Sequence, residues 1–245
     1  MSGRRDELAA RLAEVRERVD AACAAAGRAD APPTLVAVTK FFPGSDVELL
    51  AGMGVTDIGE SRDQEAGDKV AGLSEQVRAD LRVHFVGQLQ TNKARRVARY
   101  ADVVQSVDRS RLVRALDSGR ETAVEEEDAT EPLDVLLQVD LGEGDEAGRG
   151  GAAPGTLGAL ADEVAAARWL RLRGVMAIAP RDLTPDDTRR AFDRLVALGE
   201  ELRHTHPDAT WVSAGMSGDL ETAVAAGATH LRVGSAILGS RPPHR

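Results

Sequence analysis

Eight short apolar segments alternate with helical segments along this chain, and this alternation restricts the possible folds more than any other feature. The apolar segments are rich in Val, Leu and Ile, which is typical of parallel strands buried on both faces. Amphipathic segments between them, such as Ala94–Tyr100, Leu157–Ala167 and Ala191–Leu202, predict helices. The predicted strands are Leu35–Thr39, Asp57–Gly59, Val83–Gly87, Val103–Val107, Val135–Val139, Leu172–Ile178, Trp211–Ala214 and Leu231–Gly234.

An extra helix is predicted before the first strand, because Leu8, Leu12, Val15 and Val19 recur at helical spacing. Eight βα units in 245 residues are arranged most economically as a (β/α)8 TIM barrel of the α/β class. We expect one domain over residues 1–245. A doubly wound open sheet is the alternative fold, since strands are easily miscounted in a single sequence.

Three segments between the predicted strands carry more local signals. Thr184-Pro185-Asp186-Asp187 predicts a helix start, with a capping hydroxyl, a proline in the first turn and acids at the positive end of the helix dipole. The acidic segment Glu121–Glu131 is expected to lie on the solvated surface. Gly142–Gly151 is flexible by composition, and in a barrel it would be either a lid or a loose loop on the ligand-binding face.

The composition argues against several classes of partner and compartment. A net charge of −9, with no basic face or aromatic stacking platform, argues against nucleic acid. No apolar run approaches the length of a membrane span, and the charged N-terminal segment lacks a signal-peptide core. The single cysteine, Cys23, excludes an internal disulfide and is expected to pack in the core. We expect a cytoplasmic protein without membrane partners, and we take it to be a monomer.

A lysine closes the first predicted strand. Lys40 is one of only three lysines, with Lys69 and Lys93, among 31 lysines and arginines. In α/β folds ligands bind at the carboxyl ends of the strands, where partial desolvation is expected to lower the pKa of an ammonium group. A neutral amine at this place can attack an aldehyde. The alternative is a lysine that only reaches from a strand end into solvent.

The segments after the last two predicted strands are suited to an anion. Ser217 follows the seventh strand and is predicted to cap the next helix. Gly234 and Ser235 follow the eighth strand, where small residues let the backbone approach an anion and donate to it. In barrels the loops after strands seven and eight commonly form a phosphate site. Taken singly, an ordinary helix cap and an ordinary turn would also explain these residues.

Together these residues describe one ligand, with an aldehyde for Lys40, a phosphate for Ser217, Gly234 and Ser235, and a ring between them that meets the cation Arg232. Pyridoxal 5′-phosphate (PLP) has this layout. An arginine holds its proton too strongly to give it up, so Arg232 would leave the pyridine nitrogen unprotonated. The ring would then be a weaker electron sink than one paired with an acid.

Six segments, distributed over nearly the whole chain after the first helix, resemble the pyridoxal phosphate homeostasis protein family. Their order and spacing agree with that family throughout, and its fold is similar to the barrel domain of alanine racemase. The segments are Leu35–Lys40, Gly59-Glu60, His84–Lys93, Gly174–Ile178, Ser213–Ser217 and Arg232–Gly239. The resemblance implies a PLP-binding barrel.

By this resemblance Lys40 is the Schiff-base lysine, Arg232 faces the pyridine nitrogen, and Ser217, Gly234 and Ser235 hold the phosphate. Met216, inside a matching segment, and Ser61 complete the predicted cofactor-binding residues. The family usually has asparagine at the position of Ser61, so the hydrogen bond that this asparagine would make to the ring is in question.

Several other positions lie near the predicted site. The family usually has proline or histidine where this chain has Gln88, and a lysine before the glycine where it has Arg149-Gly150. His84, in the third strand, is interpreted as structural rather than catalytic. Asn92 and Lys93 begin the following helix, where a binding role and a solvated helix start are equal alternatives.

Three functions are compatible with these residues. The first is a protein that binds and buffers PLP without substrate turnover, with delivery to PLP-dependent apoenzymes as an extension of that role. The second is an amino-acid racemase, which needs a second proton-transfer group across the cofactor. The only tyrosine, Tyr100, is expected on the wrong face of the barrel, and no second domain is expected. The third, a cofactor-free Schiff-base aldolase, gives Arg232 no purpose. We favour the first.

Overall fold

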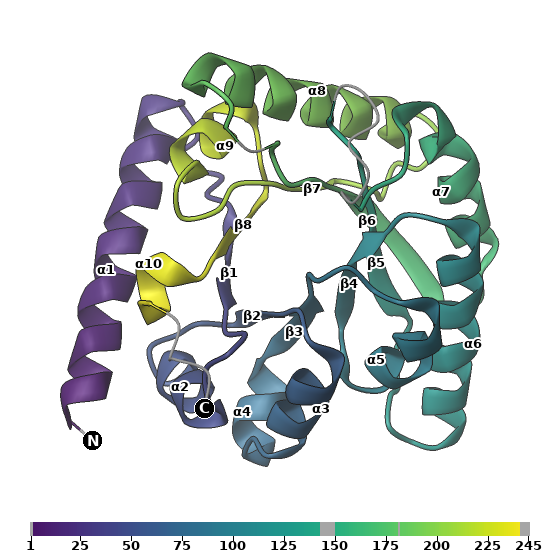
Figure 1. Cartoon of the computed structure of the whole chain (residues 1–245), viewed down its shortest axis with the longest axis horizontal. Helices are drawn as coiled ribbons and strands as arrows, with labels where there is room; N and C mark the ends of the chain where they lie inside the picture. Colours follow the sequence, from purple (N-terminus) through teal and green to yellow (C-terminus); the bar gives the residue numbers. More distant parts are fainter. Residues whose placement is uncertain (1, 143–149, 181, 241–245) are drawn as a thin grey trace.

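The computed structural model describes residues 2–142, 150–180 and 182–240, and its eight parallel strands close into a barrel in the order β1 to β8 (Figure 1). Closure is made by β1 and β8, where Leu35 pairs with Leu231. The barrel prediction is therefore confirmed, and the open sheet is excluded. The strands are β1 Thr34–Val38, β2 Asp57–Glu60, β3 Arg82–Phe85, β4 Val103–Val107, β5 Leu133–Gln138, β6 Leu170–Met176, β7 Trp211–Ser213 and β8 His230–Val233.

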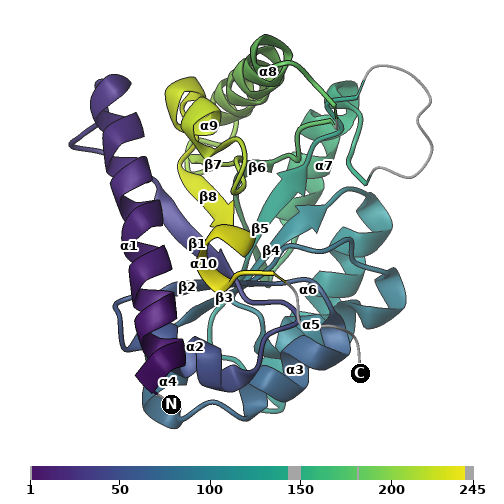
Figure 2. The same ribbon diagram turned by 60° about the vertical axis from the view of Figure 1, so that its left-hand side comes forward.

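Helices surround this barrel on its outside (Figures 1 and 2). They are α1 Ser2–Ala25, α2 Gly44–Ala51, α3 Asp63–Ala71, α4 Glu75–Asp80, α5 Ala94–Tyr100, α6 Ser110–Glu125, α7 Leu157–Ala166, α8 Pro185–Arg203, α9 Leu220–Ala226 and α10 Ser235–Leu238, with short 3-10 turns η1 Thr91–Lys93 and η2 Pro154–Thr156. None of the helices in the described ranges is long and apolar enough to cross a membrane.

The predicted N-terminal helix is α1, which lies along α9 and α10 on the outside of the barrel (Figure 2). Its apolar face is buried, and Cys23 is buried with it, as predicted. The predicted start of α8 is also confirmed, because the Thr184 hydroxyl accepts a 3.2 Å hydrogen bond from the Asp187 amide.

Two sequence predictions for loops have different outcomes. The acids of Glu121–Glu131 are exposed, as predicted, but the first part of this segment still belongs to α6, with Ala123 buried beneath it. Most of the Gly142–Gly151 segment, residues 143–149, lies outside the described residues. Its interpretation as a lid or a loose loop stays a prediction.

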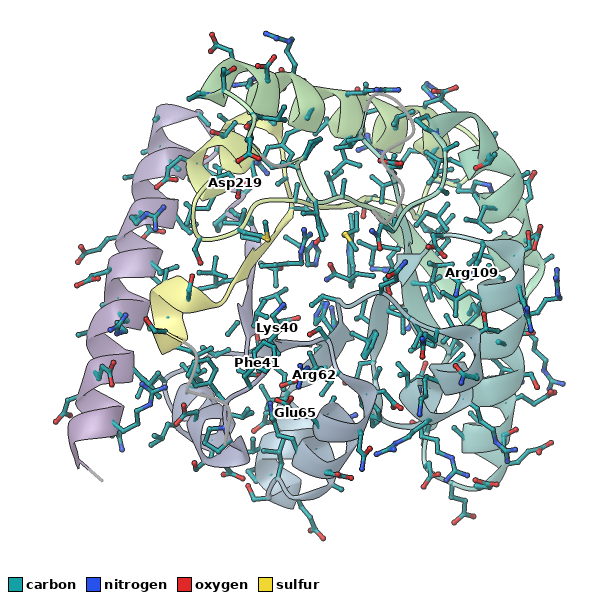
Figure 3. All side chains as sticks on the ribbon, viewed as in Figure 1. Lys40, Phe41, Arg62, Glu65, Arg109 and Asp219 are labelled. Atoms are coloured by element: carbon teal, nitrogen blue, oxygen red, sulfur yellow. The ribbon has the colours of Figure 1, made fainter. Side chains whose placement is uncertain are left out.

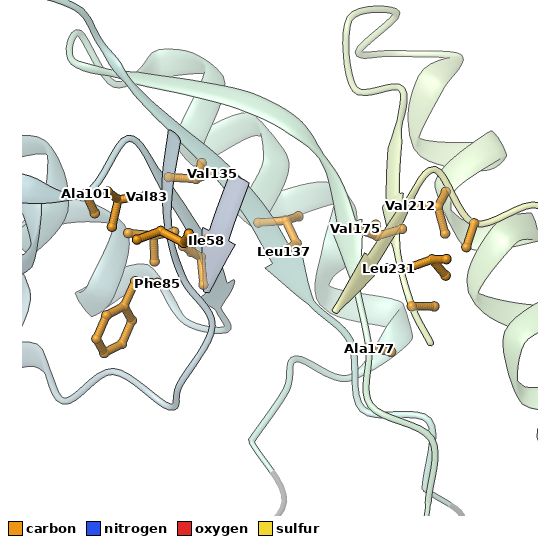
Figure 4. Close-up of a cluster of buried hydrophobic side chains, with 14 of the residues drawn as sticks. Ile58, Val83, Phe85, Ala101, Val135, Leu137, Val175, Ala177, Val212 and Leu231 are labelled. Carbon is orange, nitrogen blue, oxygen red and sulfur yellow. The ribbon is translucent and has the colours of Figure 1, made fainter. Parts of the chain in front are cut away.

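The main hydrophobic core lies between the strands and the helices. Figure 4 shows part of this layer, including Ile58 of β2, Val83 of β3 and Val135 of β5. Side chains alternate between the faces of a strand, so the remaining strand positions point into the barrel. A small apolar cluster of Val103, Leu136 and Met176 forms separately there. Much of the other interior is polar, which the apolar appearance of the strands did not suggest.

Gly174 in β6 allows a close approach to β7. Its φ is 149°, and a Cβ at this position would lie 1.9 Å from the carbonyl oxygen of Trp211. We expect Gly174→Ala to lower the free energy of unfolding by about 3 kcal/mol, measured by urea denaturation. Gly158→Ala is the matched control, because Gly158 lies in α7 with open space around its Cβ position. That change should stabilise the protein by up to about 1 kcal/mol. Equal effects of the two changes would contradict this account of β6.

Candidate functional site

A cavity of about 390 Å³ opens at the carboxyl ends of β1, β7 and β8. Six of the seven predicted binding residues line it, namely Lys40, Met216, Ser217, Arg232, Gly234 and Ser235. These residues come from segments at opposite ends of the chain, and the pairing of β1 with β8 brings them together. The structure thus gathers the predicted lysine, arginine and serines around one hollow.

Lys40 lies in a tight turn after β1. It is half-buried, and the next residue, Phe41, has a φ of 72°, which a bulky side chain rarely adopts. The Phe41 amide donates a 2.5 Å hydrogen bond to Glu65, which fixes this backbone conformation. The Phe41 ring lies 6.0 Å from the Lys40 ammonium and 4.6 Å from the Arg62 guanidinium (Figure 3). The turn therefore holds Lys40 at the edge of the cavity.

A buried ion pair supports this turn from behind. The Lys69 ammonium contacts Glu60 at 2.6 Å and donates a 2.9 Å hydrogen bond to the carbonyl of Thr39, the residue before Lys40. The Thr39 hydroxyl donates to the same Glu60 oxygen at 2.6 Å. Burial raises the pKa of Glu60 even though Lys69 and Thr39 oppose this. This role of Lys69 and Glu60 was not predicted from the sequence.

The two serines of the cavity interact directly. The Ser235 hydroxyl donates to the Ser217 hydroxyl at 3.2 Å, and the Ala236 amide donates to the same Ser217 oxygen at 3.3 Å. Arg18 of α1 holds this loop, because it donates to the Ser217 carbonyl at 3.1 Å. The loops after β7 and β8 thus place two hydroxyls and backbone amides side by side.

The prediction that Ser217 caps the next helix is wrong. Helix α9 begins at Leu220, and Asp219 occupies the N-cap position. Asp219 accepts a 2.5 Å hydrogen bond from the Met216 amide, which closes a turn around Ser217 and Gly218 and delays the helix. The Ser217 hydroxyl is directed instead to the start of α10.

Arg232 forms the floor of the cavity and is almost fully buried, with 4% of its surface exposed. Its guanidinium donates to the Ser213 hydroxyl at 2.7 Å and to the Ala177 carbonyl at 2.8 Å. Burial lowers the pKa of Arg232 to about 10. Arg232 therefore stays charged at neutral pH and keeps its remaining donors for a ligand.

Two large apolar side chains flank the cavity. Ile178 and Met216 are 48% and 39% exposed, and they are the exposed large hydrophobic side chains of the described part of the chain. Exposed apolar groups gathered at one hollow indicate a ligand surface rather than a random surface position. A flat apolar ring is the type of group that they would cover.

The other predicted positions lie outside this lining. Among the described residues, Ser61 is not one of those that line the cavity, and it packs where a side chain on Gly87 would clash with it. Asn92 and Lys93 are exposed at the start of the helix after β3, which favours the solvated alternative. Tyr100 is directed to the carbonyl of Asp63, between α3 and α5. The binding role of Ser61 stays a prediction.

His84 is fully buried inside the barrel, as the structural interpretation predicted. It lies between Asp57 and Gln105, with hydrogen-bonding distances of 2.8 Å to each. Gln105 and Ser213 were not singled out from the sequence. A polar residue in the middle of the apolar Val103–Val107 segment was the available signal for Gln105.

Comparisons with known proteins agree with this fold. The model of the alanine racemase N-terminal domain matches residues 5–242. A pyridoxal phosphate homeostasis protein from Mycobacterium bovis is 42% identical over 97% of this chain and 94% of its own length. The protein of the same name from Escherichia coli K12 is 37% identical, over 96% of this chain and 97% of its own length.

Solved structures of related proteins have the same fold as this chain. PipY from Synechococcus elongatus, solved with PLP bound, has a TM-score of 0.78 and 31% identity, over 95% of this chain and all of that chain. Alanine racemase from Corynebacterium glutamicum, at 19% identity and a TM-score of 0.64, shares the fold over 60% of its own chain. The chain belongs to the alanine racemase N-terminal domain family and, within it, to the pyridoxal phosphate homeostasis proteins.

Proposed function

We propose that this protein binds pyridoxal 5′-phosphate and takes part in intracellular PLP homeostasis, without substrate turnover. We further propose that one domain, residues 1–245, carries this function as a monomer in the cytoplasm. PLP-dependent apoenzymes are the partners to which it would deliver the cofactor. The single cavity that joins Lys40, Arg232 and the two serines carries the proposal, and the names of the relatives support it.

The donor set of the cavity fits each part of PLP. The hydroxyls of Ser217 and Ser235 and the backbone at Gly234 would hold the phosphate, since small residues and amide donors suit an anion. The buried cation Arg232 would face the ring nitrogen. The exposed apolar side chains of Ile178 and Met216 would lie against the ring.

When bound, PLP supplies an aldehyde that condenses with a lysine amine and loses one water. Lys40 is the lysine at this cavity, and its place is fixed by the contacts of its two neighbours, Thr39 and Phe41. Arg232 keeps its own proton, so it would bind the ring nitrogen without protonating it. Such a contact would leave the ring a weaker electron sink than one paired with an acid.

A racemase would need a second acid or base across the ring from Lys40. Tyr100 lies between α3 and α5 with its hydroxyl on the Asp63 carbonyl, so it does not provide this group. We expect no steady turnover of alanine or serine, measured with the cofactor-loaded protein by chiral chromatography. A rate near 1 per second or above, lost in Lys40→Ala, would contradict a role without catalysis.

The most direct test compares the affinities for PLP and for pyridoxal, which lacks the phosphate. Charge-assisted hydrogen bonds to a bound anion contribute roughly 1.5–3 kcal/mol each, so pyridoxal should bind at least about a hundredfold more weakly. Ser217→Ala should weaken PLP binding by at least about tenfold. Ser118→Ala, on the exposed surface of α6, is the matched control and should have no effect. Equal affinity for PLP and pyridoxal would refute the phosphate site.

A further inference from the structure

The barrel interior contains a continuous row of hydrogen-bonding side chains from five strands. Arg232 of β8 contacts Ser213 of β7 at 2.7 Å, and Ser213 contacts Gln105 of β4 at 2.7 Å. Gln105 contacts His84 of β3, and His84 contacts Asp57 of β2, both at 2.8 Å. Since β4 and β7 are not neighbours in the barrel, the bond between Gln105 and Ser213 crosses its interior. The row therefore joins the cavity to the opposite end of the barrel.

The two ends of this row fix the direction of every hydrogen bond in it. An arginine can only donate, so Ser213 accepts from Arg232 and must give its own proton to an acceptor, the Gln105 amide oxygen. The Gln105 amide nitrogen then faces Nδ1 of His84, which must be the unprotonated nitrogen. The His84 proton lies on Nε2 and is donated to Asp57, an acceptor.

The Asp57 carboxylate, at the other end of the row, is suited to accept the hydrogen bond from His84. Burial works to raise the pKa of Asp57, but the hydrogen bonds from His84 and Thr56 outweigh it and hold that pKa below its ordinary value. The Asp57 carboxylate is therefore ionised at neutral pH. The row has a cation at one end and an anion at the other, and each side-chain nitrogen and oxygen of Ser213, Gln105 and His84 has a hydrogen-bond partner.

This row constrains how Arg232 presents its guanidinium. One nitrogen is held by Ser213 and another by the Ala177 carbonyl, so two contacts on different nitrogens set the orientation of the group. Without Gln105, the Ser213 hydroxyl would lose the acceptor of its proton, and the direction of the Ser213 hydroxyl would no longer be fixed. The contact of Ser213 with Arg232 would then hold the guanidinium less firmly.

We infer that Gln105, acting through Ser213, is a positioning residue that orients Arg232 toward the ring nitrogen of the bound cofactor. This inference rests on the proposed function, because the ring nitrogen belongs to PLP. Gln105 itself would touch no part of the ligand.

The test uses the full-length protein and two ligands, PLP and its 1-deaza analogue, in which a C–H replaces the ring nitrogen. The ratio of their affinities measures the contact of Arg232 with that nitrogen. We expect wild-type protein to prefer PLP by at least about tenfold. Gln105→Met should lower this preference by about tenfold. A displaced Arg232 weakens the binding of PLP, whereas the analogue has no ring nitrogen for Arg232 to contact and its affinity should not change.

Three further variants make the result specific. Ser213→Ala removes only one hydroxyl and should lower the ratio in the same way, even where Gln105→Met folds poorly. Gln105→Glu keeps an oxygen for Ser213 and should retain the ratio. Gln138→Met is the matched control, because Gln138 is another buried glutamine of the barrel and bonds to the Gly150 carbonyl instead.

The outcomes separate the inference from the proposed function. Failure of wild-type protein to bind PLP would overturn both. Normal wild-type binding, with Gln105→Met and Ser213→Ala weakening both ligands equally or neither, would overturn this inference alone and leave the row with a purely structural role.

Discussion

Lys40→Ala should completely abolish the borohydride-stable attachment of PLP to this protein. Lys40 is the lysine that lines the cavity, and its neighbours Thr39 and Phe41 are both held by hydrogen bonds. In wild-type protein, reduction with borohydride followed by peptide mapping should place the added mass on Lys40. The visible absorption of the loaded protein should disappear in the variant.

The other two lysines provide controls for this result. Lys69 is buried in an ion pair with Glu60, and Lys93 is exposed at the start of the helix after β3. Neither lines the cavity in the described part of the chain. Lys93→Ala should retain both the colour and the added mass. Added mass on Lys69 or Lys93 in wild-type protein would refute the assignment to Lys40.

Lys40→Ala also separates the contribution of the aldehyde to PLP binding from the contribution of the phosphate. The two serines and Arg232 are unchanged in this variant, so PLP should still bind reversibly and more tightly than pyridoxal. Loss of all phosphate-dependent binding in Lys40→Ala would indicate that the serine loops do not form an independent phosphate site.

The number and order of the strands could be predicted because each strand is buried on both faces and is followed by a helix. The predicted bounds differ from the observed ones by no more than two residues. The end of a strand depends on where its neighbours stop pairing, and this is a tertiary property. At β1, for example, Thr39 was predicted in the strand but begins the turn that carries Lys40.

The lining residues of the cavity could be predicted because they lie near or just after the carboxyl ends of strands, which meet on one face of any barrel. The direction of the Ser217 hydroxyl could not, because it depends on the turn closed by Asp219. A serine before a helical segment has the same local sequence whether it caps that helix or faces another loop. Only the contact with α10 decides between the two.

The row from Arg232 to Asp57 could not be predicted from the sequence, for a different reason. Strand alternation shows which residues point inward, but it does not show which inward residues meet across the barrel. Gln105 and Ser213 lie 108 positions apart in the chain and come from strands that are not neighbours. Their contact depends on the curvature of the closed sheet, which no local pattern encodes.

Among single substitutions in the residues that support the Lys40 turn, Lys69→Met should lower the free energy of unfolding most. It leaves the fully buried Glu60 carboxylate without the ammonium that lies 2.6 Å away, and one Glu60 oxygen already has no hydrogen-bond partner in the described structure. Breaking a buried ion pair in this way typically costs roughly 3–5 kcal/mol of the free energy of unfolding. Urea denaturation at neutral pH would measure this loss. Lys93→Met is the matched control and should cost no more than about 1 kcal/mol, because Lys93 is exposed and 4.0 Å from Asp63.

The loss should also depend on pH in a defined direction. Burial raises the pKa of Glu60 in the folded wild-type protein, and the removal of Lys69 takes away the main opposing charge and raises it further. Between the unfolded pKa of a glutamate, about 4.3, and this raised value, the folded state binds more protons than the unfolded state. The stability of Lys69→Met should therefore fall as pH rises through this window and recover as pH is lowered. Glu60→Gln combined with Lys69→Met should remove this pH dependence, because the Glu60 carboxyl that causes it is no longer present. A Lys69→Met variant as stable as Lys93→Met at every pH would show that the ion pair does not hold the turn that carries Lys40.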